Sequence, residues 1–222
     1  TIQRILTAPA PRGGPRGRRS AWRDSMGKEQ EIKLAVSDLQ LLDCILCDRE
    51  LQPRLLEPYR YIRMHTTYYD TQDEFLRAHR WTLRLRTEND RSVVTVKTPG
   101  ENGARGEWET EAEFLDEALP ELVRLGAPAE LAALDAQQLA PVCGASFTRI
   151  TAELRVDEET TCMICGDVGE LRREGRSALL CELELELKDG SWAALRAYAR
   201  TLAARYGLQE EPRSKHARAR SL

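Results

Sequence analysis

Alternating apolar and polar positions run through most of the chain, and this alternation predicts strands. Successive side chains of a strand point to opposite faces, so a period of two marks a strand with one buried and one polar face. The pattern predicts a strand that starts at Glu29 and seven more over 59–71, 81–90, 92–100, 105–114, 146–158, 160–171 and 177–190. A polar turn at residues 88–91 predicts a hairpin between the third and fourth strands.

Segments with apolar residues three and four positions apart predict helices between these strands. The first covers 37–51, with Ser37 or Asp38 as its N-cap, and the last covers 191–207 and stops at Gly207. Two helical segments, 116–126 and 128–140, form the middle, where Pro120 and Pro128 are expected to act as breakers. Two strand-rich halves around a helical middle favour an antiparallel α+β fold of about eight strands.

Charged residues occupy the polar face of several predicted strands. Glu182, Glu184 and Glu186 form one row, with leucines on the opposite face. The other rows are Glu29, Glu31 and Lys33; Arg84 and Arg86; Lys97; Glu107, Glu109 and Glu111; and Arg149, Thr151, Glu153 and Arg155. A solvent-exposed face with cross-strand ion pairs would explain any one of these rows alone.

Taken together, the rows suit the inner wall of a closed β-barrel, whose side chains alternate between lumen and exterior. Buried charges must be paired or bound to a metal. Carboxylate oxygens are ligands for Mg²⁺ or Mn²⁺, and arginine and lysine bind phosphate oxygens. The pattern therefore indicates a site for a divalent cation and a polyanion.

Composition narrows the choice of partner. The formal net charge of the 222 residues is −3, which does not indicate a nucleic-acid-binding protein. No apolar run approaches the roughly 18–20 residues that span a bilayer, so no membrane partner is expected. Residues 1–25, rich in Arg, Pro and Gly, are expected to form a disordered leader or tag, and residues 26–222 a single domain that begins at Met26.

Cysteine and histidine give little sign of further chemistry. Cys44/Cys47 and Cys162/Cys165 have C-x-x-C spacing, which also occurs in zinc sites. The first pair is expected on the apolar side of a helix and the second on opposite faces of a strand, so we favour buried, reduced thiols in a cytoplasmic protein. The three histidines, His65, His79 and His216, lack metal-ligand spacing and are expected at the surface or at an edge. There is no P-loop, so side chains must hold any phosphate.

The order of motifs resembles the CYTH domains, the triphosphate tunnel metalloenzymes. The segment 29–33, "EQEIK", is similar to the family's E-x-E-x-K signature. "YYDTQDEFLRAHRWTLRLR", "TVKTPG", "RGEWETE", "PVCGASFTR", "GDVGEL", "CELELELKDG" and "SKHARA" follow in the family's order, so that the resemblance covers about residues 27–220. It implies a closed eight-stranded antiparallel β-tunnel with helices outside, and monomeric or homodimeric assembly.

The resemblance also implies the roles of individual residues. The implied metal ligands for Mg²⁺ or Mn²⁺ are Glu29, Glu31, Glu182 and Glu184, with help from Glu107 or Glu109. The implied phosphate-binding residues are Lys33, Arg84, Arg86, Lys97, Arg149 and Lys215, and Asp167 would orient one of these bases. The catalytic set would be Glu29, Glu31, Lys33 and Lys97. Glu186 and Lys188 are expected near the tunnel mouth, and Arg218 and Arg220 on the surface.

Two positions depart from the family pattern: Thr151 stands where a second base is common, and Ala219 replaces a glycine. Hydrolysis of inorganic triphosphate to diphosphate and phosphate is the activity that the resemblance favours. A class IV-type adenylyl cyclase, a thiamine triphosphatase and a non-catalytic polyphosphate- or nucleotide-binding module are the alternatives. A structural protein would need its charged faces on the outside.

Overall fold

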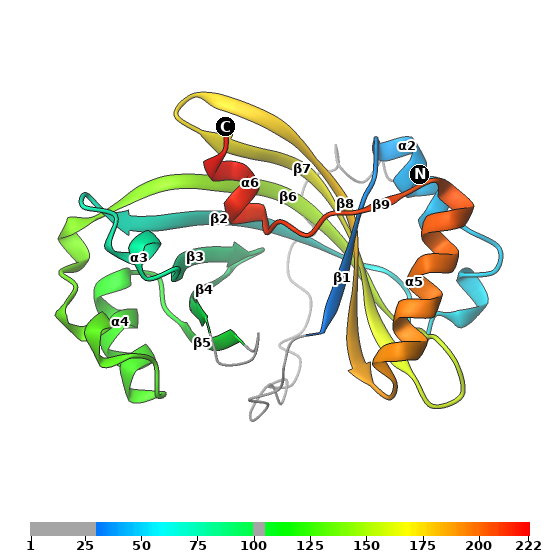
Figure 1. Cartoon of the computed structure of the whole chain (residues 1–222), viewed down its shortest axis with the longest axis horizontal. Coiled ribbons are helices and arrows are strands. Elements are labelled where there is room, and N and C mark those ends of the chain that lie inside the picture. The colour runs from blue at the N-terminus through cyan, green and yellow to red at the C-terminus, as the bar shows by residue number, and fades with distance from the viewer. Residues whose placement is uncertain (1–29, 100–104) are drawn as a thin grey trace.

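The computed structural model of the chain describes residues 30–99 and 105–222 (Figure 1). Glu29 and the predicted leader lie outside this range, so the predictions for them stay untested. The strands are β1 Glu31–Ala35, β2 Arg60–Thr71, β3 Thr82–Glu88, β4 Arg91–Pro99, β5 Arg105–Glu111, β6 Leu139–Arg155, β7 Thr161–Arg173, β8 Arg176–Asp189 and β9 Gln209–Glu210. The α-helices are α2 Leu39–Leu46, α3 Phe75–Ala78, α4 Leu115–Arg124, α5 Trp192–Tyr206 and α6 Lys215–Arg220. Short 3₁₀ turns cover Gln52–Arg54, Ala129–Ala133 and Ala136–Gln138.

The strands form one antiparallel sheet in the order β5-β4-β3-β2-β6-β7-β8-β1-β9, which confirms the predicted α+β class. Closure of this sheet into a tunnel was expected and is not observed: within the described residues no ladder joins β5 to the opposite edge. Part of that edge is already occupied, because Leu34 and Ala35 of β1 pair with β9. In Figure 1 the sheet curves like an arch, with β5 and β1 at its two feet.

Helices cover the outside of both feet of the arch (Figure 1). Helices α2 and α5 pack on β1, β7 and β8 through a core that includes Leu34, Leu42, Leu183 and Leu195. Helix α4 packs on β4 and β5 through a second core that includes Leu122, Val94 and Val96. Apolar faces of the strands thus point outward to helices, which leaves the polar faces for the inside of the arch. None of the described helices has the length and apolar character needed to cross a membrane.

The ladder register places the charged rows, as far as the structure describes them, on this inner face. Glu182 lies opposite Asp167, and Asp167 lies opposite Arg149. The register continues through β2 to β3, β4 and β5, where Lys97 lies opposite Glu107. Because side chains alternate along every strand, each predicted phosphate- or metal-binding residue on the described strands belongs to one continuous surface.

The C-terminal segment, residues 208–222, is rich in polar residues and nevertheless forms regular structure. It folds back on the sheet and forms β9 and α6. Helix α6, capped by the Ser214 hydroxyl that accepts from the amide of Ala217, packs under the arch. Ala219 lies there in a third apolar cluster with Met64, Tyr68 and Phe147.

Local expectations failed at one proline and at two cysteines. Pro120 lies inside α4 instead of ending it. The helix continues through the proline because the face with Ala118, Leu119 and Leu122 is buried against the core, and this packing stabilises the helix. Cys44 and Cys47 are exposed, since α2 buries the face of Leu42, Ile45 and Leu46. Cys162 and Cys165 are buried and belong to opposite faces of β7, as expected.

Candidate active site

A cluster of three carboxylates lies on β7 and β8 at the inner face. Asp167, Glu182 and Glu184 each place one carboxylate oxygen within 4.8 Å of the others, and Asp167 and Glu182 are fully buried. The ammonium of Lys215, from α6, lies 2.7 Å from Asp167 Oδ2 and 2.9 Å from Glu184 Oε1, and it also contacts Glu182. Buried charges need such pairing, because desolvation of an isolated ion is costly.

Arg149 neutralises the same cluster from β6. Its Nε and one terminal nitrogen donate to the two oxygens of Asp167 at 2.8 and 2.7 Å, and it also donates to Glu184. This two-point contact fixes the guanidinium plane. It gives Asp167 the position of an orienting residue, although that role stays a prediction.

The surroundings of Glu182 and Glu184 shift the pKa values of these two neighbouring carboxylates in opposite directions. Burial raises the pKa of Glu182. Burial acts in the same direction on Glu184, but Lys215 and Arg149 outweigh it and hold the pKa of Glu184 well below its usual value. For Lys215, burial lowers the pKa, and the three carboxylates outweigh that effect and raise it. Opposite shifts on neighbouring carboxylates are typical of functional sites.

Arg218 and Arg220 are not surface residues, which corrects the sequence-based expectation. The Arg218 side chain is 12% exposed and pairs with Glu182, and its Nε is buried without a hydrogen-bond partner in the described part of the chain. Arg220 pairs with Asp70 at 3.3 Å and with Glu74 at 2.6 Å. Both arginines are drawn inward because α6 docks on the sheet. The four-residue spacing from Lys215 to Ala219, both buried, is the signal for this docking.

A second, basic region, formed by Arg84 and Arg86, lies on β3. Arg86 is buried and donates to the Thr66 hydroxyl at 3.0 Å, and no described carboxylate forms an ion pair with it. Burial and the neighbouring Arg84 lower the pKa of Arg86 to about 10. Arg84 lies 3.8 Å from Glu107, yet its buried Nε has no acceptor among the described residues. Buried donors without partners are rare, so this region has unsatisfied capacity for an anion.

The remaining predicted residues lie at the feet of the arch. Lys33 pairs with Glu31 at 2.9 Å on β1, and Lys97 pairs with Glu107 at 2.8 Å between β4 and β5. Glu109 lies on the edge strand β5 and is exposed. Among the described residues, the close carboxylate group includes Glu182 and Glu184 of the predicted ligands and adds Asp167, but it does not include Glu31, Glu107 or Glu109.

The donor set of the cluster fits a hard divalent cation. Carboxylate oxygens are the ligands that Mg²⁺ and Mn²⁺ prefer. Glu182 Oε1 is buried and faces Lys215 without hydrogen-bond geometry, so one ligand atom is not satisfied within the described structure. The ammonium of Lys215 stands where a cation would bind these three groups.

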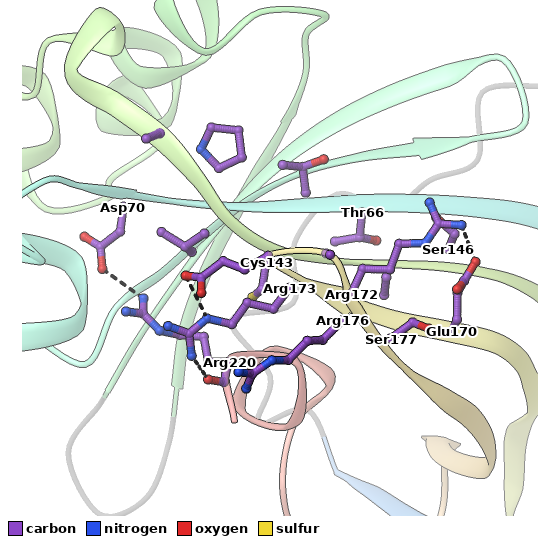
Figure 2. A pocket seen from close by; sticks show the side chains of 18 of the residues that line it. Thr66, Asp70, Cys143, Ser146, Glu170, Arg172, Arg173, Arg176, Ser177 and Arg220 are labelled. Atoms are coloured by element: carbon purple, nitrogen blue, oxygen red, sulfur yellow. Dashed lines mark hydrogen bonds and ion pairs between the residues drawn. The ribbon is translucent and has the colours of Figure 1, made fainter. Parts of the chain in front are cut away.

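A cavity of about 820 Å³ lies elsewhere, at the end of β2 and β6 and beside the β7–β8 hairpin (Figure 2). None of the predicted site residues lines it. Three of its four arginines are paired with acids: Arg220 with Asp70 and Glu74, Arg172 with Glu170, and Arg173 with Glu174, while Arg176 donates to the carbonyl of Leu222. This balance of charge makes it a weaker anion site than the inner face.

Comparisons with known proteins agree with the fold and with the motif order. The model of the CYTH domain family matches residues 27–219. An inorganic triphosphatase of Haemophilus influenzae is 25% identical over 179 residues, which make up 80% of this chain and 50% of that protein. The chain therefore spans about half the length of this curated relative.

Two solved structures share the fold. A putative adenylyl cyclase from Hippeastrum, described as having a dominant triphosphatase activity, superposes with a TM-score of 0.58 at 21% identity and covers 87% of this chain and 95% of that one. A putative adenylate cyclase from Bacillus halodurans gives a TM-score of 0.52 at 17% identity, with 84% and 93% coverage. The match of the family model to most of the sequence, together with the shared fold, shows that this chain belongs to the CYTH domain family, the triphosphate tunnel metalloenzymes.

Proposed function

We propose that the chain hydrolyses a triphosphate in the presence of Mg²⁺ or Mn²⁺, and that inorganic triphosphate is the preferred substrate, converted to diphosphate and phosphate. One observation supports this most strongly. The buried guanidinium of Arg86 and the unsatisfied Nε of Arg84 lie on the same face as the carboxylate cluster of Asp167, Glu182 and Glu184. A polyanion and a divalent cation together would satisfy both regions.

Each region has a defined role in this proposal. Arg84, Arg86 and Lys97 bind phosphoryl oxygens at one side, and Arg149 and Lys215 bind them next to the carboxylates. The metal, when bound, neutralises phosphoryl charge and lowers the pKa of a bound water. Water adds to a terminal phosphorus while the bridging P–O bond breaks and diphosphate leaves. Fixed cations stabilise the charge of the transition state, and the loss of one such donor costs roughly 10²–10³ in rate.

Two further residues belong to the proposed metal side. Glu31 and Lys33 form an ion pair on β1, and Lys33 lies opposite Glu184 in the ladder. Glu31, with Glu29, would complete the ligands, and Lys33 would contact phosphate. Glu107 and Glu109 are proposed as supporting ligands from β5.

A phosphate-release panel tests the proposal. Inorganic triphosphate, ATP, thiamine triphosphate and longer polyphosphate are compared with Mg²⁺, with Mn²⁺ and with chelator, and the ATP reaction is also assayed for cyclic AMP. We expect the highest kcat/KM for inorganic triphosphate and no turnover with chelator. Cyclic AMP as the main product would favour the cyclase alternative, and binding without turnover of any substrate would favour the non-catalytic module.

Glu31→Gln is the decisive variant for this assignment. We expect it to abolish metal-dependent turnover, whereas Glu158→Gln, in an exposed loop, should leave turnover unchanged. Near-normal phosphate release from Glu31→Gln would overturn the metal-ligand assignment.

A further inference from the structure

Phe147 lies on the inner face of β6, and cations from three different elements surround its ring. Lys215 Nζ of α6 lies 5.1 Å from the ring centroid, Arg86 Cζ of β3 lies 5.9 Å away, and Arg149 Cζ of β6 lies 6.0 Å away. The ring itself is buried, at 6% exposure. These distances are within the range in which an aromatic ring attracts a cation.

The three cations repel one another, and the attraction of each cation to the ring offsets part of that repulsion. Burial and then Arg84 lower the pKa of Arg86, and Arg149 adds to this effect; Arg149 acts in the same direction on Lys215, whose pKa the carboxylates nevertheless raise overall. Lys215 and Arg149 have the carboxylate cluster to offset this repulsion, whereas Arg86 forms no ion pair within the described residues and contacts the Thr66 hydroxyl and Phe147. The negative face of an aromatic ring attracts a cation without neutralising it, so the guanidinium stays available to an anion.

We propose that Phe147 is a further positioning residue, which holds Arg86 and acts together with the carboxylates to hold Arg149 and Lys215 in place for triphosphate. Its ring lies between the basic region of β3 and the carboxylate cluster. It contacts Arg86 of the basic region, and Arg149 and Lys215, which pair with the carboxylates. This inference rests on the proposed function and deepens it, because it names the side chain that connects the two regions.

A purely apolar role for Phe147 makes a different prediction. The ring also packs in the cluster with Met64, Tyr68, Ala145 and Leu180, and burial alone would hold it there. If burial were its whole contribution, an apolar replacement of similar size would preserve activity. If the π face matters, activity must follow the electron density of the ring at constant shape.

A graded series of fluorinated phenylalanines at position 147 separates these roles, since fluorine removes the negative face and changes the ring volume little. We expect kcat/KM for inorganic triphosphate to fall stepwise, by about tenfold at three fluorines, through a rise in KM and with Tm nearly unchanged. Phe147→Leu should lose at least as much. Equal kcat/KM across the fluorinated series would overturn the proposal, even if Phe147→Leu fails to fold.

Two controls keep the outcomes distinct. The same fluorinated residues at Phe114, which is 61% exposed, should leave kcat/KM unchanged. Ring-current shifts of the Lys215 side chain in NMR spectra of the protein without substrate should disappear in Phe147→Leu. If wild-type protein shows these shifts but hydrolyses no triphosphate, the proposed function fails while the ring contact stands; if the shifts are absent in wild type, the positioning role fails by itself.

Discussion

Lys215 Nζ lies 2.7 Å from Asp167 Oδ2, at the centre of three buried carboxylates. Removing the ammonium therefore leaves buried negative charges without their main partner. Loss of one member of a buried ion pair costs about 3–5 kcal/mol, so Lys215→Met should lower the Tm by roughly 6–20 °C. Because the carboxylates then lack a cation, added Mn²⁺ should raise the Tm of the variant more than that of wild type. Thermal unfolding with and without metal measures both effects.

The matched control for this experiment is Arg196→Met, at an exposed position of α5. It should change neither the Tm nor the response to Mn²⁺. A Lys215→Met protein as stable as wild type, or one whose Tm does not respond to metal, would show that Lys215 does not compensate the cluster.

Asp167 holds Arg149 through two hydrogen bonds, and this pair gives a second prediction. Asp167→Asn has the same shape but lacks the charge and one acceptor oxygen. Arg149 should then lose its fixed orientation, and kcat/KM for triphosphate should fall by roughly 10². Steady-state phosphate release measures the change, and Asp189→Asn, at the exposed end of β8, provides the comparison. Unchanged kcat/KM in Asp167→Asn would contradict an orienting role.

The charged surface could be predicted from the sequence because its pattern is local. A period of two places Glu182 and Glu184 on one face of β8 whatever their neighbours are. The ladder then determines that this row meets Asp167 on one side and β1 on the other, and pairing between β8 and β1 joins segments about 150 residues apart. The period of a single strand does not show that the rows belong together; the charge pattern of all the rows and the family resemblance indicated it.

Helix α6 could not be predicted in the same way. It has six residues and no apolar stripe, so its position depends on ion pairs such as Arg218 with Glu182 and Arg220 with Asp70. Partners of that kind become neighbours only after the sheet has formed. The occupied edge of the sheet could not be predicted either, because β9 is a two-residue strand in a polar segment and pairs with β1 only after the chain has folded back.

Arg86 is buried with no described carboxylate paired to it, and this predicts opposite effects of one substitution. Arg86→Met removes the desolvation cost of the cation and its repulsion with Arg84, so the free protein should be as stable as wild type or more stable. The same change should weaken triphosphate binding without metal by roughly tenfold or more, since a hydrogen bond between charged groups is lost. Calorimetric titration measures the affinity for triphosphate, and thermal unfolding measures the stability of the free protein.

Arg155→Met supplies the comparison for Arg86, because Arg155 is an exposed arginine at the end of β6. It should affect neither stability nor binding. If Arg86→Met binds triphosphate as tightly as wild type, the basic region of β3 is not the anion site.

His216 was expected at the surface, but it is half-buried, and its ring lies 4.8 Å from that of Tyr68. Burial, followed by the charge of Arg220, lowers the pKa of His216 from 6.5 to about 4. Between these two values the unfolded chain binds a proton that the native protein does not. Stability must therefore decrease as the pH falls through this window, and it is fully present above pH 6.5. Comparison of the Tm at pH 7.5 and pH 4.5 measures the decrease.

Replacement of this imidazole should remove its share of the acid sensitivity. His216→Phe keeps an aromatic ring against Tyr68 and cannot be protonated, so its Tm should fall less between pH 7.5 and pH 4.5 than that of wild type. His65→Phe alters an exposed histidine on β2 and should keep the wild-type slope. If the Tm of both variants falls with acid as steeply as that of wild type, protonation of His216 does not oppose folding. The acid sensitivity then arises from carboxylates such as Asp48. The hydrogen bond from Tyr206 is the largest of the causes that lower the pKa of Asp48 to about 2.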